Sequence, residues 1–238
     1  MSIAENVAEV RQRITAAAAR AGRDAQAITL MAVGKTFPAQ KIREAYETGI
    51  RVFGENRVQE FSGKSAALAD LRDAEWHMIG HLQSNKAAAA ADIFSAVDSL
   101  DSLKLGEKLN ASAGKLGKKI SVLIEINVGG EAAKSGVAPR SSQLDELLAA
   151  APRFEHLEFC GLMTVPPFAE DADLTRSCFR RLRELRDEID ARKLPSVHFD
   201  VLSMGMSHDF EVAIEEGATC VRVGTAIFGE RPTHHGGT

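Results

Sequence analysis

The sequence predicts a (β/α)8 barrel, in which parallel strands alternate with helices, preceded by one additional helix. Two observations favour this fold. Eight short apolar runs recur along the chain, and helix-compatible stretches separate them. Several of the runs are almost continuously apolar, as expected when both faces of a parallel sheet are covered. The same pattern also allows an open, doubly wound sheet as the structural alternative.

The first expected element is an amphipathic helix over about residues 2–21. Ile3, Val7, Val10 and Ile14 recur at steps of three and four among charged residues, and a glycine follows. This segment lacks the apolar core of a signal peptide, and no stretch approaches the roughly 18 apolar residues of a membrane span. We therefore expect a cytoplasmic protein.

The strands and helices then alternate to the end of the chain. The expected strands are apolar runs of four to nine residues, at 28–33, 51–54, 75–80, 94–99, 120–128, 156–163, 198–204 and 220–224. The expected helices lie between them, at about 38–48, 57–71, 83–91, 101–117, 141–151, 171–192 and 208–217. No linker-like tract divides the chain. We expect residues 1–238 to form one domain, with a disordered tail at about 232–238.

Composition narrows the possible partners. The chain has 238 residues and a net charge of −4, and its charged residues form no long block of one sign. This argues against nucleic acid or a membrane surface and favours a small molecule or a protein. Cys160, Cys178 and Cys220 are odd in number and widely spaced, so we expect reduced thiols and no zinc site.

The active face of such a barrel lies at the carboxyl ends of its strands, and phosphate is often bound by the loops after the last two strands. Here these loops are SMGMS, residues 203–207, and VRVGT, residues 221–225, both rich in small and hydroxyl residues. Another interpretation is that Ser207 only caps the helix beginning near His208 and that Gly224 only turns the chain. The spacing alone leaves both interpretations open.

Two cations also need an explanation. Arg222 lies inside an apolar strand, where an unpaired guanidinium is costly, so it requires an acidic partner or a ligand atom. Lys35 ends the first strand, after Gly34, where its amine should lie over the barrel mouth. A desolvated amine with a lowered pKa suits Schiff-base chemistry with an aldehyde, although many strand-end lysines are only surface residues.

Lys35, Arg222 and the two late loops together suggest pyridoxal 5′-phosphate (PLP). The aldehyde would be on Lys35, the phosphate in the loops and the ring nitrogen near Arg222. Six segments strengthen this interpretation because, in this order, they resemble the YggS/PROSC family of PLP-binding proteins, also called PLP homeostasis proteins. They are AVGKTFPAQKIREAYETGIRVFGENRVQE, WHMIGHLQSNK, INVGGEAAKSGV, GLMTVPP, LSMGMSHDFEVAI and VRVGTAIFGER.

The resemblance extends from about Ala32 to Arg231. It implies a fold-type III PLP barrel similar to the N-terminal domain of alanine racemase, with Lys35 forming the internal aldimine. It further implies that Arg222 faces the pyridine nitrogen and that Asn56 lies beside the cofactor. The phosphate would be bound, in part through backbone amides, by Ser203, Met204, Ser207, Gly224 and Thr225. Many relatives have serine at the position of Gly34, and some have proline at the position of His81.

The same residues bear on reactivity. An arginine opposite the ring nitrogen disfavours the protonated ring on which carbanion chemistry depends. Racemisation also needs a second base, a tyrosine in alanine racemase, and the one tyrosine here, Tyr46, falls in the helix after the first strand. We therefore expect a non-catalytic PLP carrier or regulator, monomeric, with apo PLP-dependent enzymes as recipients, as the resemblance implies.

Two alternatives stay open. The first is a PLP-dependent amino-acid racemase whose base is His81 or His208. The second is a barrel enzyme that binds phosphate without PLP, in which Lys35 and Arg222 would be structural.

Overall fold

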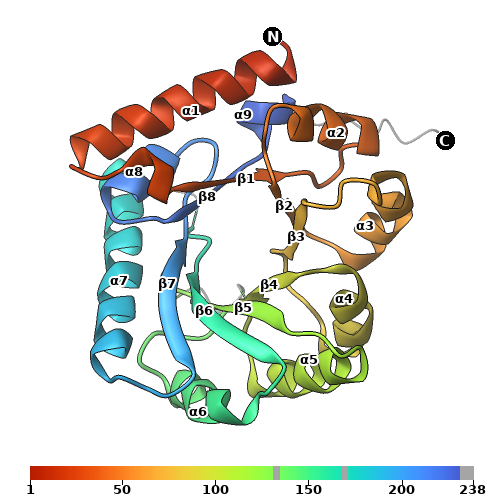
Figure 1. Ribbon diagram of the computed structural model, residues 1–238. Coiled ribbons are helices and arrows are strands. Elements are labelled where there is room, and N and C mark those ends of the chain that lie inside the picture. The colour runs from red at the N-terminus through yellow and green to blue at the C-terminus, as the bar shows by residue number, and fades with distance from the viewer. Residues whose placement is uncertain (131–134, 168–170, 231–238) are drawn as a thin grey trace, which may run out of the picture.

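The computed structural model describes residues 1–130, 135–167 and 171–230. Its eight strands are all parallel and close into a barrel, because β1 pairs with both β2 and β8 (Figure 1). The predicted (β/α)8 barrel is confirmed, and the open sheet is wrong. The strands are β1 Thr29–Val33, β2 Val52–Glu55, β3 Glu75–Met78, β4 Ala96–Leu100, β5 Ile120–Glu125, β6 Leu157–Met163, β7 Val197–Ser203 and β8 Cys220–Val223.

Helices surround the barrel (Figure 1). They are α1 Ile3–Arg20, α2 Ala39–Glu47, α3 Val58–Ser65, α4 Ala87–Ile93, α5 Leu103–Lys115, α6 Ser142–Ala150, α7 Ala172–Ala191, α8 Phe210–Glu215 and α9 Thr225–Phe228. The predicted helix at 57–71 is α3 followed by a 3-10 turn, Ala66–Leu68, and the one at 208–217 is the shorter α8. Helix α9 was not predicted, since four residues are too few to show a helical period. The predicted disordered tail lies outside the described residues.

The additional helix α1 is present where the apolar stripe predicts it. Ser2 and Glu5 form a reciprocal capping box at its start, and Ile3, Val7, Val10 and Ile14 are buried. The helix lies along the outside of the barrel, against α8 and α9 (Figure 1). Among the described residues, no helix is long and apolar enough to cross a membrane.

A continuous apolar core fills the space between the strands and the helices. Several strands also carry buried polar residues, among them Asp98, Glu125, Ser203 and Arg222. Glu55, at the end of β2, is buried as well, where it contacts Lys64 of α3. The three cysteines form no disulfide, and two of them, Cys178 and Cys220, are buried. Polar groups inside the barrel therefore need partners or a function, because a buried polar group without a partner is costly.

Candidate functional site

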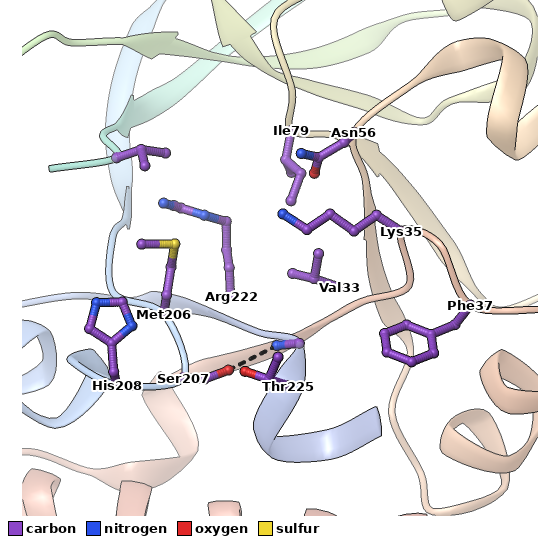
Figure 2. Close-up of a pocket in the computed structure, with 12 residues that line it drawn as sticks. Val33, Lys35, Phe37, Asn56, Ile79, Met206, Ser207, His208, Arg222 and Thr225 are labelled. Atoms are coloured by element: carbon purple, nitrogen blue, oxygen red, sulfur yellow. Dashed lines mark hydrogen bonds between the residues drawn. The ribbon is translucent and has the colours of Figure 1, made fainter. Parts of the chain in front are cut away.

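A cavity of about 300 Å³ opens at the carboxyl ends of the strands (Figure 2). Six of the predicted site residues line it: Lys35, Asn56, Ser207, Arg222, Gly224 and Thr225. The remaining lining residues are Val33, Phe37, Ile79, Val165, Met206 and His208. The closed barrel brings its first and last strands together, because β1 pairs with β8. Lys35 follows the end of β1 and Arg222 lies in β8, so the two residues come to the same part of the barrel.

Lys35 lies in the turn between β1 and α2 and is half-buried. Where the strand ends, the Gly34 amide still donates to the Gly54 carbonyl of β2 at 3.0 Å, which fixes the start of the turn against the sheet. Figure 2 shows the Lys35 side chain extended into the cavity, with its amine directed toward the Arg222 guanidinium and with Asn56 beside it. The structure therefore places this amine over the barrel mouth, as the sequence predicts.

Arg222 is buried in β8, with 3% of its surface exposed. Its Nη1 donates to Ser203 Oγ at 2.7 Å, and its Nη2 donates to the Thr164 carbonyl at 2.7 Å. The sequence left an acidic partner or a ligand atom as the two choices, whereas the hydrogen-bond partners found here are neutral groups of the protein. Burial lowers the pKa of Arg222, yet a guanidinium stays protonated near neutral pH. The cavity therefore has a fixed positive charge in its wall.

Ser207 joins the two late loops. Its Oγ accepts hydrogen bonds from the Gly224 amide at 3.2 Å and from the Ala226 amide at 3.3 Å (Figure 2 draws the first). The alternative interpretation, in which Ser207 only caps the following helix, is wrong, since the N-cap position of α8 is Asp209. The Ser207 hydroxyl and the amides beside Thr225 thus gather at one end of the cavity.

Gly205 lets the SMGMS loop turn back toward β8. Its φ is +93°, and a Cβ there would lie 2.6 Å from the Ala213 Cβ, so a larger residue does not fit. Its carbonyl accepts a hydrogen bond from the Arg222 amide at 2.9 Å. This contact holds the loop alongside the strand that carries the arginine.

Ser203 and Met204 do not line the cavity. Both are fully buried; the Ser203 hydroxyl contacts Arg222, and the Met204 amide donates to the Cys220 carbonyl at 3.1 Å. Met206 and His208, from the same loop, reach the cavity instead. Sequence reasoning missed Met206 and considered His208 only as a possible base, because a motif gives the loop but not which side chains turn inward.

The residues considered as possible bases are separated by the fold. Tyr46 lies on α2, where its hydroxyl contacts Asp73 and the Arg51 guanidinium packs 4.1 Å from its ring. His81 Nδ1 lies 3.1 Å from Asp101 Oδ2, and this histidine does not line the cavity. His208 does line it, with its Nε2 3.3 Å from Asp209 Oδ2.

The sequence of this chain matches a known protein family along nearly its whole length. Residues 2–232 match the family model of the alanine racemase N-terminal domain. A pyridoxal phosphate homeostasis protein of Aquifex aeolicus is 47% identical over 231 residues, which cover 97% of this chain and 99% of the relative. One of Escherichia coli K12 is 43% identical over 231 residues, covering 96% of this chain and 97% of the relative. The chain belongs to the pyridoxal phosphate homeostasis protein family.

Two solved structures resemble this homeostasis-family barrel to different degrees. PipY of Synechococcus elongatus, in a structure with PLP bound, is 37% identical with a TM-score of 0.81, and the match covers 96% of this chain and 100% of PipY. Alanine racemase of Clostridium difficile is 16% identical with a TM-score of 0.71 and shares the fold. The match covers 98% of this chain but 58% of the racemase. The family predicted from six sequence segments is therefore confirmed.

Proposed function

We propose that the protein binds PLP in this cavity and acts as a PLP carrier or regulator in the cytoplasm. The observation that carries this proposal is that Lys35, Arg222 and the Ser207–Gly224–Thr225 group line one cavity. The cavity lies at the small end of the ligand-pocket range of about 300–1,000 Å³, which suits a single substituted ring. The family membership and the PLP-bound PipY structure support the same ligand.

Each proposed contact follows from the chemistry of the lining residues. When bound, PLP supplies an aldehyde that condenses with amines. Lys35 offers the amine, while Ser207, Gly224 and Thr225 offer hydroxyl and amide donors for the phosphate. Arg222 would face the pyridine nitrogen, with Asn56 beside the ring.

We keep Ser203 and Met204 among the proposed PLP-binding residues, as residues that act from outside the cavity lining. Ser203 would act through Arg222, whose guanidinium it holds. Met204 would support the phosphate loop from the core, where it is fully buried.

We also propose that the protein has no strong catalytic activity. A cationic Arg222 beside the ring nitrogen disfavours ring protonation, and with it the electron withdrawal that PLP enzymes use. Tyr46 is held at Asp73 and Arg51, outside the cavity lining, so it does not supply a second base. We infer a monomer that releases PLP to apo PLP-dependent enzymes. An amino-acid racemase is the second candidate, because His208 lines the cavity.

The first prediction concerns Lys35. Purified protein mixed with PLP should develop a visible absorption band, and borohydride reduction followed by peptide mass spectrometry should locate the pyridoxyl group on Lys35. Lys35→Ala should abolish the band and weaken PLP binding at least about tenfold, since the covalent bond is lost while the other contacts persist. A parent protein that stays colourless with PLP would contradict the proposal and favour the PLP-free barrel enzyme.

Two further assays separate a carrier from a racemase. The PLP-loaded protein should restore activity to an apo PLP-dependent enzyme faster than the same protein reduced with borohydride does. Chiral analysis of L-alanine after long incubation should show no steady formation of the D-isomer. Steady racemisation that Lys35→Ala and His208→Ala both abolish would establish the racemase instead.

A further inference from the structure

Helix α3 contacts the turn that carries Lys35. The turn comprises residues 34–37, between β1 and α2. Lys64 Nζ donates to the Gly34 carbonyl at 2.8 Å and to the Phe37 carbonyl at 3.3 Å, so one ammonium group bridges both ends of the turn. Within the turn, the Thr36 amide donates to the Glu60 carboxylate. Side chains of α3 therefore hold the backbone on both sides of Lys35.

Lys64 is itself anchored in the barrel. Its Nζ lies 2.8 Å from Glu55 Oε1, and the exposed fractions of the two side chains are 10% and 0%. Glu55 is the last residue of β2, and the next residue, Asn56, lines the cavity. This buried Lys64–Glu55 contact thus connects the Lys35 turn with the strand end that places Asn56.

The turn packs closely against the Lys64–Glu55 contact. A Cβ on Gly34 would lie 2.9 Å from Glu55 Oε1 and 3.0 Å from Ile42 Cδ1, so the backbone at Gly34 packs directly on the carboxylate. Thr36 has a φ of +65°, a left-handed conformation that a β-branched residue rarely adopts. Backbone in such a conformation persists when its surroundings hold it, and such positions cluster at ligand sites.

Burial raises the pKa of Glu55 to about 7, so its carboxyl is only partly ionised near neutral pH. Even a fully charged buried pair is a poor source of stability, because desolvation of the two charges offsets their attraction. Lys64 and Glu55 therefore matter for geometry. The Lys35 amine sits at the end of a flexible four-carbon stem, and the turn backbone decides where that stem begins. Covalent capture of an aldehyde depends steeply on such placement, since a displacement of about 1 Å can change a rate about 100-fold.

We propose that Lys64, anchored by Glu55 and assisted by Glu60, is a positioning residue that holds the Lys35 turn so that the amine enters the cavity. This inference rests on the proposed function, because it concerns capture of PLP by Lys35. It assigns a separate task to α3, which holds the lysine without contributing a residue to the cavity lining.

The test is Lys64→Met, which keeps an unbranched apolar side chain of nearly the same length and removes the ammonium group. We expect growth of the PLP absorption band to slow by roughly tenfold to 100-fold after mixing. Pyridoxamine 5′-phosphate has the same ring and phosphate but no aldehyde, and its affinity should change less than about twofold. In a Lys35→Ala background, Lys64→Met should leave PLP affinity unchanged, because a residue that acts only through Lys35 has nothing left to position.

Lys118→Met is the matched control. Lys118 is also half-buried and also donates to two main-chain carbonyls, those of Asp92 at 3.1 Å and Phe94 at 3.5 Å, but away from the cavity lining. It should not alter band growth. Glu60→Ala, which removes the contact to the Thr36 amide, should slow band growth in the same direction as Lys64→Met. It provides a second measurement should Lys64→Met fold poorly, as judged from its thermal midpoint.

The outcomes distinguish this inference from the proposed function. If the parent captures PLP on Lys35 and folded Lys64→Met and Glu60→Ala capture it equally fast, the positioning role is wrong and the proposed function stands. An equal loss of affinity for PLP and for pyridoxamine 5′-phosphate would also overturn the positioning role, since the whole pocket would then be affected. A parent that captures no PLP overturns both.

Discussion

At the scale of single residues, Arg222 shows how a buried cation is kept available to a ligand. Both of its hydrogen-bond acceptors are neutral, so its charge is not cancelled by a direct ion pair. The carboxylates of Asp98, Asp209 and Glu125 favour its charged form without forming an ion pair with it. The arrangement favours an electron-rich ring nitrogen next to the guanidinium, as the proposed function requires.

Replacing Ser203 tests this arrangement. Ser203→Ala leaves Nη1 of the buried guanidinium without an acceptor, which should lower the free energy of unfolding by about 2 kcal/mol in urea titrations. A less firmly held guanidinium should also weaken PLP binding by roughly fivefold, or about 1 kcal/mol. Ser95→Ala is the control, because Ser95 hydrogen-bonds Trp76 at the start of β4, outside the cavity lining. Equal PLP affinity in Ser203→Ala and the parent would contradict the role of Ser203.

The sequence could predict which loops form the site more readily than which side chains enter it. Arg222 and Lys35 were identifiable because a charge beside an apolar strand demands a partner. The contact of Arg222 with Thr164 could not be predicted, since Thr164 lies 58 residues away and contributes only a backbone carbonyl. The contacts of Lys64 were missed for the same reason, because side chain to backbone contacts leave no pattern in the sequence.

At the scale of elements, helix α1 links the start of the chain to the phosphate end of the proposed site. Asn6 Nδ2 donates to the Ile227 carbonyl of α9 at 2.8 Å, and Arg13 pairs with Glu211 of α8 at 3.1 Å. Helix α9 begins with Thr225, which lines the cavity. The additional helix is therefore packed against the two short helices that follow the late loops.

A substitution within α1 should consequently destabilise the barrel as a whole. Ile14 is 5% exposed in the apolar core, so Ile14→Ala should lower the free energy of unfolding by about 2–4 kcal/mol. Leu116→Ala removes a side chain that is 47% exposed and should cost less than about 0.5 kcal/mol. Urea titrations followed by circular dichroism and by PLP absorbance should give one coincident transition. A separate early transition in circular dichroism, with PLP still bound, would show that α1 unfolds on its own.

The existence of the elements was predictable because the apolar period of each is long enough to be counted. In α7 an apolar stripe of Leu174, Cys178, Leu182, Leu185 and Ile189 predicts the buried face. All of these except Leu174, which is 59% exposed near the start of the helix, are buried. The ends of the elements were harder to predict. The apolar run at 120–128, for example, continues past the end of β5 at Glu125. There Ile126 forms an isolated bridge to Val137 instead of extending the strand.

At the scale of the whole molecule, closure of the barrel is what makes the site. Counting strands predicts eight, but closure depends on the pairing of β1 with β8, and no local pattern encodes a contact between residues so far apart. The count of eight βα units favoured the closed barrel over the open sheet, the resemblance to a known barrel added support, and the observed strand order confirms it. The helices packed around the barrel bury Glu55 beside Lys64 of α3, which makes the stability of the molecule dependent on pH.

Burial raises the pKa of Glu55 to about 7, against the opposing effect of Lys64, from an ordinary value of 4.5. Between these values the folded protein holds a proton on Glu55 that the unfolded chain has released. Stability from this group is therefore complete below about pH 4.5 and is lost as the pH rises through about 7. Urea titrations from pH 5 to 8 should show the free energy of unfolding falling, by on the order of 3 kcal/mol from Glu55.

Glu55→Gln identifies the group responsible, because glutamine has no proton to lose and should flatten this part of the curve. His77 contributes at higher pH: burial opposes its protonation, but the Asp98 carboxylate outweighs burial and raises the pKa to about 9, so stability from His77 is lost as the pH rises through that value. The pH slopes of the parent and of Glu55→Gln should therefore be compared between pH 5 and 7. Glu107→Gln, which alters an exposed carboxylate, should retain the slope of the parent. A parent whose stability rises across this interval, or a Glu55→Gln variant with an unchanged slope, would mean that Glu55 is ionised in the folded barrel and that its pair with Lys64 carries full charge.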